Sequence, residues 1–172
     1  MQVHDNAPDR YVFRSNTVTA GAVISTNVHN KLDGNGKKIL VIDDDLAIRV
    51  LLQAVLRRMK FDVALAEDGA VGLEKLDQNG QFDLVLLDLM MPRLNGYEFI
   101  DAIGRRDGDR PHIVVFTAAG RRGVDKIPGD AICNSILKPF DLDKFIDIIA
   151  ECLHGDHVTA PTKSAESSPT GS

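Results

Sequence analysis

The sequence predicts an α/β protein built on a parallel sheet with helices on both faces. Between residues 37 and 154, continuous apolar runs that fit buried strands alternate with segments of helical period. Alternation of this kind implies parallel strands joined by right-handed crossovers. In addition, polar or charged residues follow several of the strand runs, at the edge where open sheets of this class bind ligands.

The first predicted strand is the apolar run 39–42, which has the composition of a strand buried on both faces. A helix follows, with apolar residues on one face and basic or amide residues on the other. Asp45 stands where its side chain would cap the first turn of this helix. Residues 62–66 predict a second short strand. The predicted core positions of the helix are Ile48, Leu51, Leu52, Val55 and Met59.

The next units continue the alternation. A second helix ends near Asn79 and Gly80, and the run 84–87 predicts the third strand. Residues 96–106 predict a third helix, and 113–116 a fourth strand.

The last two helices differ in how strongly the sequence predicts them. The segment 120–132 contains three glycines and a proline, so we expect the fourth helix to be short and residues 119–133 to be the least ordered part of the domain. A short fifth strand at 136–137 precedes a final helix that Asp141 caps. Its core face carries Leu142, Phe145, Ile146, Ile149 and Leu153.

We expect both flanks to be disordered tails, although the apolar run 18–24 could instead form a short strand or a docking segment. Residues 1–36 are rich in Asn, Thr, Ser and Gly, and the loop signal at 33–36 marks the predicted start of the domain at 37. Residues 155–172 are dominated by Pro, Ser, Thr and Gly. No stretch approaches the roughly 20 apolar residues of a membrane span, and no signal peptide begins the chain. We therefore expect a soluble, cytoplasmic protein with no membrane partner.

Composition argues against two classes of function, nucleic-acid binding and zinc binding. The net charge of −5 argues against nucleic acid as a partner, because phosphate contacts need clustered Lys and Arg. The two cysteines, Cys133 and Cys152, form no CxxC pair, so a zinc site is not predicted. One disulfide between them is possible, but both lie in apolar stretches, and we expect buried free thiols.

The candidate site lies at the strand ends, where the carboxyl ends of parallel strands share one edge. Several carboxylates close together repel one another unless a cation or protons neutralise them. A hard divalent cation such as Mg²⁺ suits oxygen ligands of this kind. With a metal present, one carboxylate could attack phosphorus as a nucleophile. These residues are Asp43, Asp44 and Asp45 after the first strand, Asp88 after the third, Thr117 after the fourth and Lys138 after the fifth.

The chain resembles the receiver domains of two-component response regulators, of the single-domain, CheY-like type. Four motifs carry the resemblance, in the order found in the family: 39–45 with its three aspartates, 87–92 with 95–96, 116–118, and 138–140. The resemblance covers residues 37–154. It implies a doubly wound five-stranded parallel sheet of strand order 2-1-3-4-5, as in flavodoxin and CheY.

The resemblance also implies a role for each matching residue. Asp88 would be the phosphoacceptor. Mg²⁺, or Mn²⁺, would be held by Asp43, Asp44, Asp88 and the backbone carbonyl of Met90. The phosphoryl group would be bound by Thr117, which moves on activation, by the backbone of Ala118 and by Lys138. The peptide bond before Pro139 is often cis in the family.

One position departs from the family pattern. Many receivers have an aromatic residue three positions before the lysine, and here that residue is Ser135. This departure favours an alternative function, an interaction scaffold that keeps the fold without phosphorylation. A metal-dependent phosphohydrolase is a third alternative, but it would need a second carboxylate close after Asp88, and residue 90 is Met.

The resemblance implies a function in a phosphorelay. The phosphodonor would be a histidine kinase or a histidine phosphotransfer protein. The output would be altered binding of an unknown partner, because too few residues follow 154 for an output domain. We expect a phosphoacceptor that slowly dephosphorylates itself rather than an enzyme with its own substrate.

Overall fold

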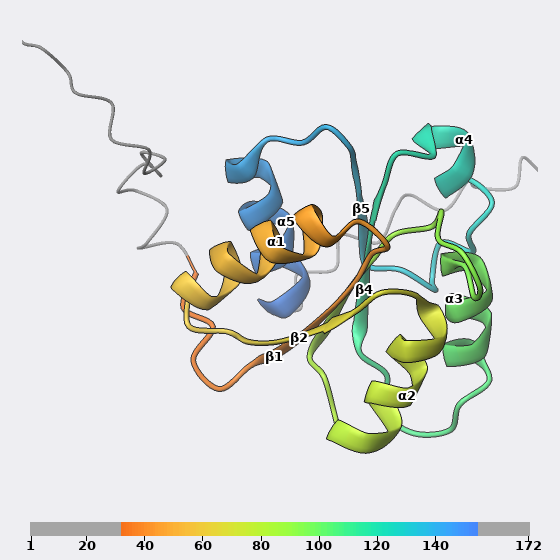
Figure 1. Cartoon of the computed structure of the whole chain (residues 1–172), viewed down its shortest axis with the longest axis horizontal. Coiled ribbons are helices and arrows are strands. Elements are labelled where there is room, and N and C mark those ends of the chain that lie inside the picture. The colour runs from red at the N-terminus through yellow and green to blue at the C-terminus, as the bar shows by residue number, and fades with distance from the viewer. Residues whose placement is uncertain (1–31, 155–172) are drawn as a thin grey trace, which may run out of the picture.

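The computed structural model describes residues 32–154 as five parallel strands and five helices (Figure 1). The sheet order is β2-β1-β3-β4-β5, so the strand order implied by the family resemblance is confirmed. The strands are β1 (Lys38–Ile42), β2 (Asp62–Ala66), β3 (Leu84–Leu87), β4 (His112–Thr117) and β5 (Asn134–Leu137). The helices are α1 (Leu46–Arg58), α2 (Gly69–Asn79), α3 (Gly96–Gly104), α4 (Gly120–Val124) and α5 (Leu142–His154).

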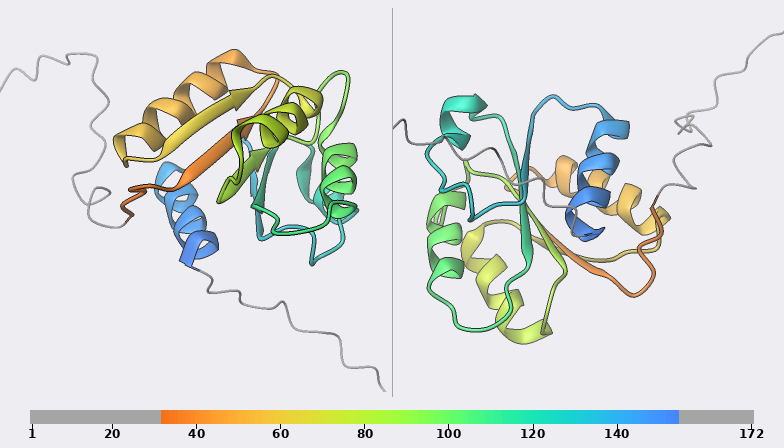
Figure 2. Two further views of the ribbon diagram at one scale, coloured as in Figure 1. Left: turned by 90° about the horizontal axis from the view of Figure 1, so that it is seen from below. Right: turned by 180° about the vertical axis from the view of Figure 1, so that it is seen from behind.

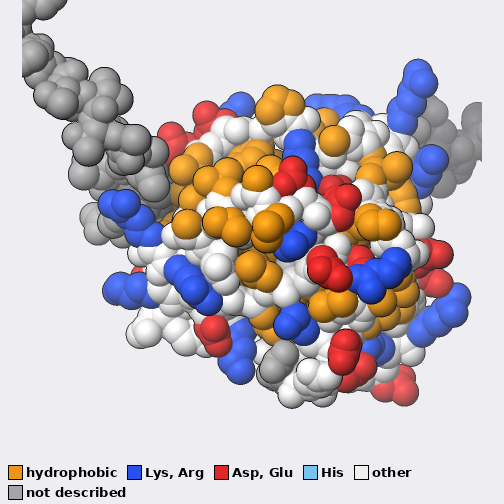
Figure 3. Space-filling model, in the orientation of Figure 1, with side chains coloured by type: hydrophobic (Ala, Val, Ile, Leu, Met, Phe, Trp, Pro, Cys, Tyr) orange, Lys and Arg blue, Asp and Glu red, His pale blue; other side chains and the backbone are white. Residues whose placement is uncertain are grey.

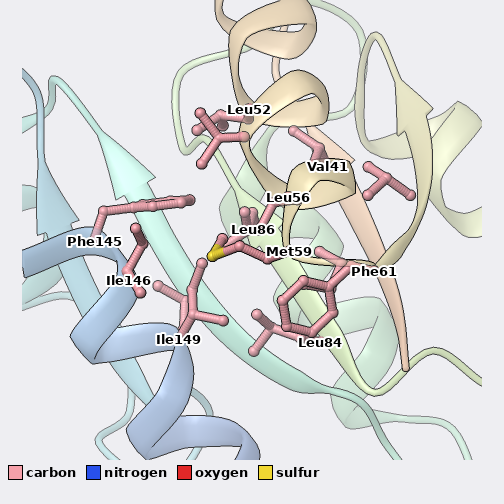
Figure 4. Close-up of a cluster of buried hydrophobic side chains, with 14 of the residues drawn as sticks. Val41, Leu52, Leu56, Met59, Phe61, Leu84, Leu86, Phe145, Ile146 and Ile149 are labelled. Atoms are coloured by element: carbon pink, nitrogen blue, oxygen red, sulfur yellow. The ribbon is translucent and has the colours of Figure 1, made fainter. Parts of the chain in front are cut away.

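The sheet separates two hydrophobic clusters. Successive residues of a strand point to opposite faces, so Ile39 and Val41 join one cluster and Leu40 and Ile42 join the other. Helices α1 and α5 cover the first face, and α2, α3 and α4 cover the second (Figure 2). The first cluster brings Leu52 and Leu56 of α1 toward Phe145 and Ile149 of α5, across the sheet residues between them (Figure 4).

The helix caps follow the sequence prediction. Asp45 Oδ1 accepts hydrogen bonds from the amides of Ala47 (2.8 Å) and Ile48 (3.4 Å) at the start of α1. Asp141 Oδ1 accepts from the amides of Asp143 (3.0 Å) and Lys144 at the start of α5. Both carboxylates satisfy backbone donors that have no partner within the helix.

The predicted core face of α1 is wrong at one position. Leu51 is 50% exposed, whereas Leu56, which the prediction omitted, is completely buried. The buried stripe of α1 centres on Leu52, Val55 and Leu56, and Leu51 lies beyond its edge. Leu46 and Val50 are also exposed, so α1 presents an apolar outer surface as well as an apolar inner one.

The two cysteines form a disulfide, so the prediction of free thiols is wrong. Cys133 directly precedes β5, and Cys152 lies on the buried side of α5. Packing of α5 against the sheet brings their Cα atoms to 6.0 Å, within the range that a disulfide spans. The pairing depends on this tertiary contact and not on a recognisable spacing of the cysteines.

Helix α4 is short, as its glycines predicted, with five residues. Gly123 approaches its surroundings closely, because a Cβ atom there would lie 2.7 Å from the Ala119 Cβ and 3.1 Å from the Tyr97 hydroxyl oxygen. That hydroxyl donates to the Gly123 carbonyl at 3.0 Å. The low order expected for residues 119–133 stays a prediction.

The chain packs on the domain before the predicted boundary at residue 37. Leu32 is buried in the first cluster, and the Gly34 amide donates to the Met59 carbonyl at 2.8 Å. The rest of the predicted N-terminal tail and the C-terminal tail, 155–172, lie outside the described residues. Within the described part of the chain, every helix is too short or too polar to cross a lipid bilayer.

Candidate functional site

The fold brings the predicted site residues to one edge of the sheet. Asp43 follows β1, Asp88 follows β3, Thr117 ends β4 and Lys138 follows β5. Because all strands are parallel and in register, their carboxyl ends meet at the same edge. Three of these residues are nevertheless buried, with whole-residue exposures of 1% for Asp43, 6% for Asp88 and 0% for Thr117.

Three aspartates form an acidic cluster at this edge. Asp43, Asp44 and Asp88 each offer a carboxylate oxygen, and these oxygens all lie within 4.8 Å of one another. Asp44 is exposed and faces solvent, while the other two are buried. A set of hard oxygen donors that is open on one side fits Mg²⁺, which typically takes one or two carboxylates and keeps several waters. The donor set therefore fits the expected cation.

Lys138 crosses the acidic cluster. Its Nζ lies 2.5 Å from Asp43 Oδ2 and 2.8 Å from Asp88 Oδ2. The same atom lies 4.9 Å from the centre of the Phe116 ring, which is within range of a cation–π contact. One ammonium thus pairs with two buried carboxylates, so with both carboxylates ionised the three groups together have a net negative charge.

The pKa values report this arrangement. Burial raises the pKa of the Asp43 carboxyl above its ordinary value, although hydrogen bonds from Lys138 and from the Asp45 amide act in the opposite direction. For Lys138, burial acts to lower the pKa, but hydrogen bonds to Asp43 and Asp88 outweigh it, and the pKa is raised. Asp43 and Asp88 therefore favour the charged form of Lys138.

Backbone amides hold the polar side chains of the site in place. The Asp45 amide donates to Asp43 Oδ1 at 2.9 Å, and the Met90 amide donates to Asp88 Oδ1 at 3.2 Å. The Ala119 amide donates to Thr117 Oγ1 at 3.1 Å. Each carboxylate therefore uses one oxygen for the backbone and the other for Lys138.

The remaining predicted residues surround this centre. Met90 follows Asp88 in the loop after β3 and is 61% exposed, and Ala118 is exposed directly after Thr117. The bond between Lys138 and Pro139 is cis, as the family pattern implied. Ser135 lies in β5 and is half-buried. Asp45 is a helix cap, as predicted, and stands apart from the cluster.

Sequence reasoning missed three residues near the site. Arg49, on the polar face of α1, donates from Nη1 to the backbone carbonyl of Asp43 at 2.5 Å. Asp68 is a fourth buried polar residue, at 1% exposure, and pairs with Arg93. No period or motif links these last two residues, because they belong to loops after different strands.

The sequence model described as the response regulator receiver domain matches residues 39–150. The chain belongs to this family. Its site residues therefore lie in the receiver domain of a two-component response regulator.

Curated relatives agree. The chain is 34% identical over 111 residues to the response regulator ArlR of Staphylococcus saprophyticus, covering 63% of this chain and 49% of that protein. It is 33% identical to the transcriptional regulatory protein CpxR of Escherichia coli K12, covering 70% of this chain and 50% of that protein. The chain thus matches half or less of these relatives' lengths.

Solved structures agree as well. The response regulator TrrA of Thermotoga maritima, in complex with Mg²⁺ and BeF, has a TM-score of 0.60 and 32% identity, covering 68% of this chain and 99% of that one. A CheY-like receiver domain from Methanospirillum hungatei has a TM-score of 0.62 and 27% identity, covering 69% and 94% respectively.

Proposed function

We propose that this receiver accepts a phosphoryl group on Asp88, from a phosphohistidine of a histidine kinase or histidine phosphotransfer protein, with Mg²⁺ or Mn²⁺ bound beside it. The observation that supports this most is the buried Asp43–Lys138–Asp88 arrangement next to the exposed Asp44. A structural sheet edge has no need for two desolvated carboxylates around one ammonium, since burying charges costs free energy.

Asp43, Asp44, Asp88 and the backbone carbonyl of Met90 would hold the metal ion. When bound, the ion supplies positive charge that offsets the repulsion between the phosphoryl oxygens and the carboxylates.

The chain's own groups would do the rest of the chemistry. An Asp88 carboxylate oxygen forms a bond to phosphorus while the bond from phosphorus to the donor's imidazole nitrogen breaks, and the imidazole keeps that electron pair. Lys138, the Thr117 hydroxyl and the Ala118 amide would bind the phosphoryl oxygens and stabilise their charge. Thr117 Oγ1 accepts from the Ala119 amide, and a turn of this side chain toward the phosphoryl group would offer a route from phosphorylation to a change in the surface around α4.

The outer surface of α1 fits a protein phosphodonor. Leu46, Val50 and Leu51 are exposed on it, and Leu46 follows the acidic residues 43–45 directly. Figure 3 shows hydrophobic side chains gathered over α1. A partner that buries these side chains would gain apolar contact area beside the phosphoacceptor.

The output would be binding of a partner that prefers one state of the surface, in the cytoplasm and with slow loss of the phosphoryl group. We propose that the chain acts as a phosphoacceptor rather than as an enzyme with its own substrate. Relatives such as CpxR are named transcriptional regulatory proteins, so the proposal of no nucleic-acid contact rests on the charge of this chain alone.

One observation favours a second function, an interaction scaffold that does not depend on phosphorylation. Ser135 occupies the place where many receivers carry the aromatic residue that responds to the threonine. A protein that keeps the acidic site but has lost this response could bind its partner in a single state.

The test is the intact mass of the protein after incubation with a small acyl phosphate and Mg²⁺. The wild type should gain one phosphoryl group, and the gain should disappear in Asp88→Asn and when the metal is chelated. Asp101→Asn is the matched control, because Asp101 is an exposed aspartate on α3, and it should be labelled like the wild type. No gain in the wild type would favour the scaffold.

A further inference from the structure

The buried Asp68 carboxylate belongs to the loop between β2 and α2 and takes no part in the acidic cluster. Its Oδ1 accepts from the Val71 amide at 2.9 Å and so caps α2. Its Oδ2 is buried and forms an ion pair with Arg93 Nη2. At 1% exposure, a carboxylate needs such a partner, since a buried charge without one is strongly disfavoured.

Arg93 belongs to the loop that follows the phosphoacceptor. Its Nη2 also lies 2.7 Å from Glu67 Oε1, so one nitrogen joins two carboxylates of the β2–α2 loop. The backbone of Arg93 has φ of +64°, a conformation that is unfavourable for residues other than glycine. Contacts to the neighbouring loop must hold the residue in this conformation.

Backbone contacts fix both ends of the same loop. The Gly96 amide donates to the Leu89 carbonyl at 3.1 Å, and the Gly69 amide donates to the Leu94 carbonyl at 3.0 Å. Neither glycine tolerates a side chain, because a Cβ atom would lie 2.3 Å from the Asp88 carbonyl oxygen at Gly96 and 2.7 Å from the Leu94 carbonyl oxygen at Gly69. The loop 89–95 is therefore pressed against the starts of α2 and α3.

We propose that the Asp68–Arg93 ion pair is a positioning device for the metal site, which holds the loop 89–95 so that the Met90 backbone stays beside Asp88. The inference rests on the proposed function, in which the Met90 carbonyl is a metal ligand. Arg93 and Asp68 touch neither the metal nor the phosphoryl group. They act through the backbone of the loop.

The direction in which Mg²⁺ affinity changes separates a positioning role of Arg93 from a simple charge effect. Arg93 carries a positive charge, so its removal would strengthen binding of a cation if it acted only through space. Loss of a positioning contact would instead weaken Mg²⁺ binding. Mutation of outer groups that orient metal ligands typically lowers metal affinity by about tenfold or more.

The experiment is a Mg²⁺ titration followed by the amide resonances of Asp44, Asp88 and Met90, well below the melting temperature of each variant. We expect Arg93→Gln to raise the dissociation constant about tenfold. Arg105→Gln is the matched control, because Arg105 makes an exposed ion pair with Asp101 on α3, and its affinity should equal that of the wild type.

A second pair of variants separates positioning from folding. Arg93→Lys should recover most of the affinity, because a single nitrogen of Arg93 makes both contacts and an ammonium can replace it. Asp68→Asn keeps an oxygen for the helix cap but removes the charge, and it should weaken Mg²⁺ binding as Arg93→Gln does.

Equal or tighter binding in Arg93→Gln would overturn the proposal while leaving the metal site intact. A wild type that binds no Mg²⁺ would overturn the proposed function itself and this inference with it.

Discussion

The two edges of the sheet differ in how they treat charge. At the amino edge lies a hollow of about 580 Å³, lined by charged side chains. They have exposed local partners: Lys37 lies 3.9 Å from Asp83, with both side chains 38% exposed, and Arg106 lies 3.0 Å from Asp77. At the carboxyl edge, Lys138 bridges two carboxylates with exposures of 1% and 7%.

Desolvation of the charged groups therefore distinguishes the candidate site from the hollow at the other edge. Ion pairs exposed to water contribute little to folding stability, because water weakens the interaction between the charges. Buried charges interact strongly, and their pKa values shift, as those of Asp43 and Lys138 do. The hollow at the amino edge has the ordinary electrostatics of a protein surface, whereas at the carboxyl edge two buried carboxylates surround one ammonium, an excess of negative charge that a cation would relieve.

The largest expected effect is on stability at the carboxyl edge. Lys138→Met leaves Asp43 and Asp88 buried without their ammonium, and we expect the free energy of unfolding to fall by about 3 kcal/mol at neutral pH without metal. Lys37→Met at the amino edge should cost less than about 1 kcal/mol. Urea denaturation of both variants checks this, and equal losses would remove the contrast between the edges.

The difference in stability between the wild type and Lys138→Met also depends on pH. The pKa of Lys138 is raised above its ordinary value of 10.5, so its contribution to stability is fully present below that pH. It is lost as the pH rises through the higher pKa of the folded state. The wild type should therefore approach Lys138→Met in stability only in strong alkali. A difference between them that does not change with alkaline pH would argue against a charged Lys138.

The disulfide offers a change of stability that should spare the site. It joins Cys133 before β5 to Cys152 in the last turn of α5, and both positions are at the amino edge. The double variant Cys133→Ser/Cys152→Ser should lose about 3 kcal/mol of unfolding free energy, as expected for a closed loop of this length. Its Mg²⁺ affinity should match that of the wild type, and a weakened affinity would show that the edges are coupled.

The smallest stability effect concerns the outer surface of α1. Leu51 is half exposed, so Leu51→Ala should change the free energy of unfolding by less than about 0.5 kcal/mol. Transfer from a phosphorylated histidine phosphotransfer protein should nevertheless slow, while labelling by a small acyl phosphate stays at the wild-type rate. Equal slowing with both donors would place the effect in the site instead of the partner contact.

The sequence was sufficient for features with a local cause. The apolar run 39–42, the caps at Asp45 and Asp141 and the short α4 all follow from periodicity, capping and glycine content. The meeting of Asp43, Asp88, Thr117 and Lys138 also follows, because parallel strands must end at one edge.

Features that depend on tertiary contact were not predictable in this way. The pairing of Cys133 with Cys152 requires the packing of α5, and the exposure of Leu51 depends on where α1 meets the sheet. The Asp68–Arg93 ion pair joins two loops that only the finished fold brings together. Local patterns contain no signal for contacts of this kind.

The most direct test of the central claim is to map the phosphoryl group after labelling with an acyl phosphate and Mg²⁺. Chemical reduction of the aspartyl phosphate formed on the protein, followed by peptide mass spectrometry, identifies the modified residue. We predict a single modified residue, Asp88 at the carboxyl edge. Modification of a residue at the amino edge, such as Asp83 or His112, with Asp88 unlabelled, would contradict the account.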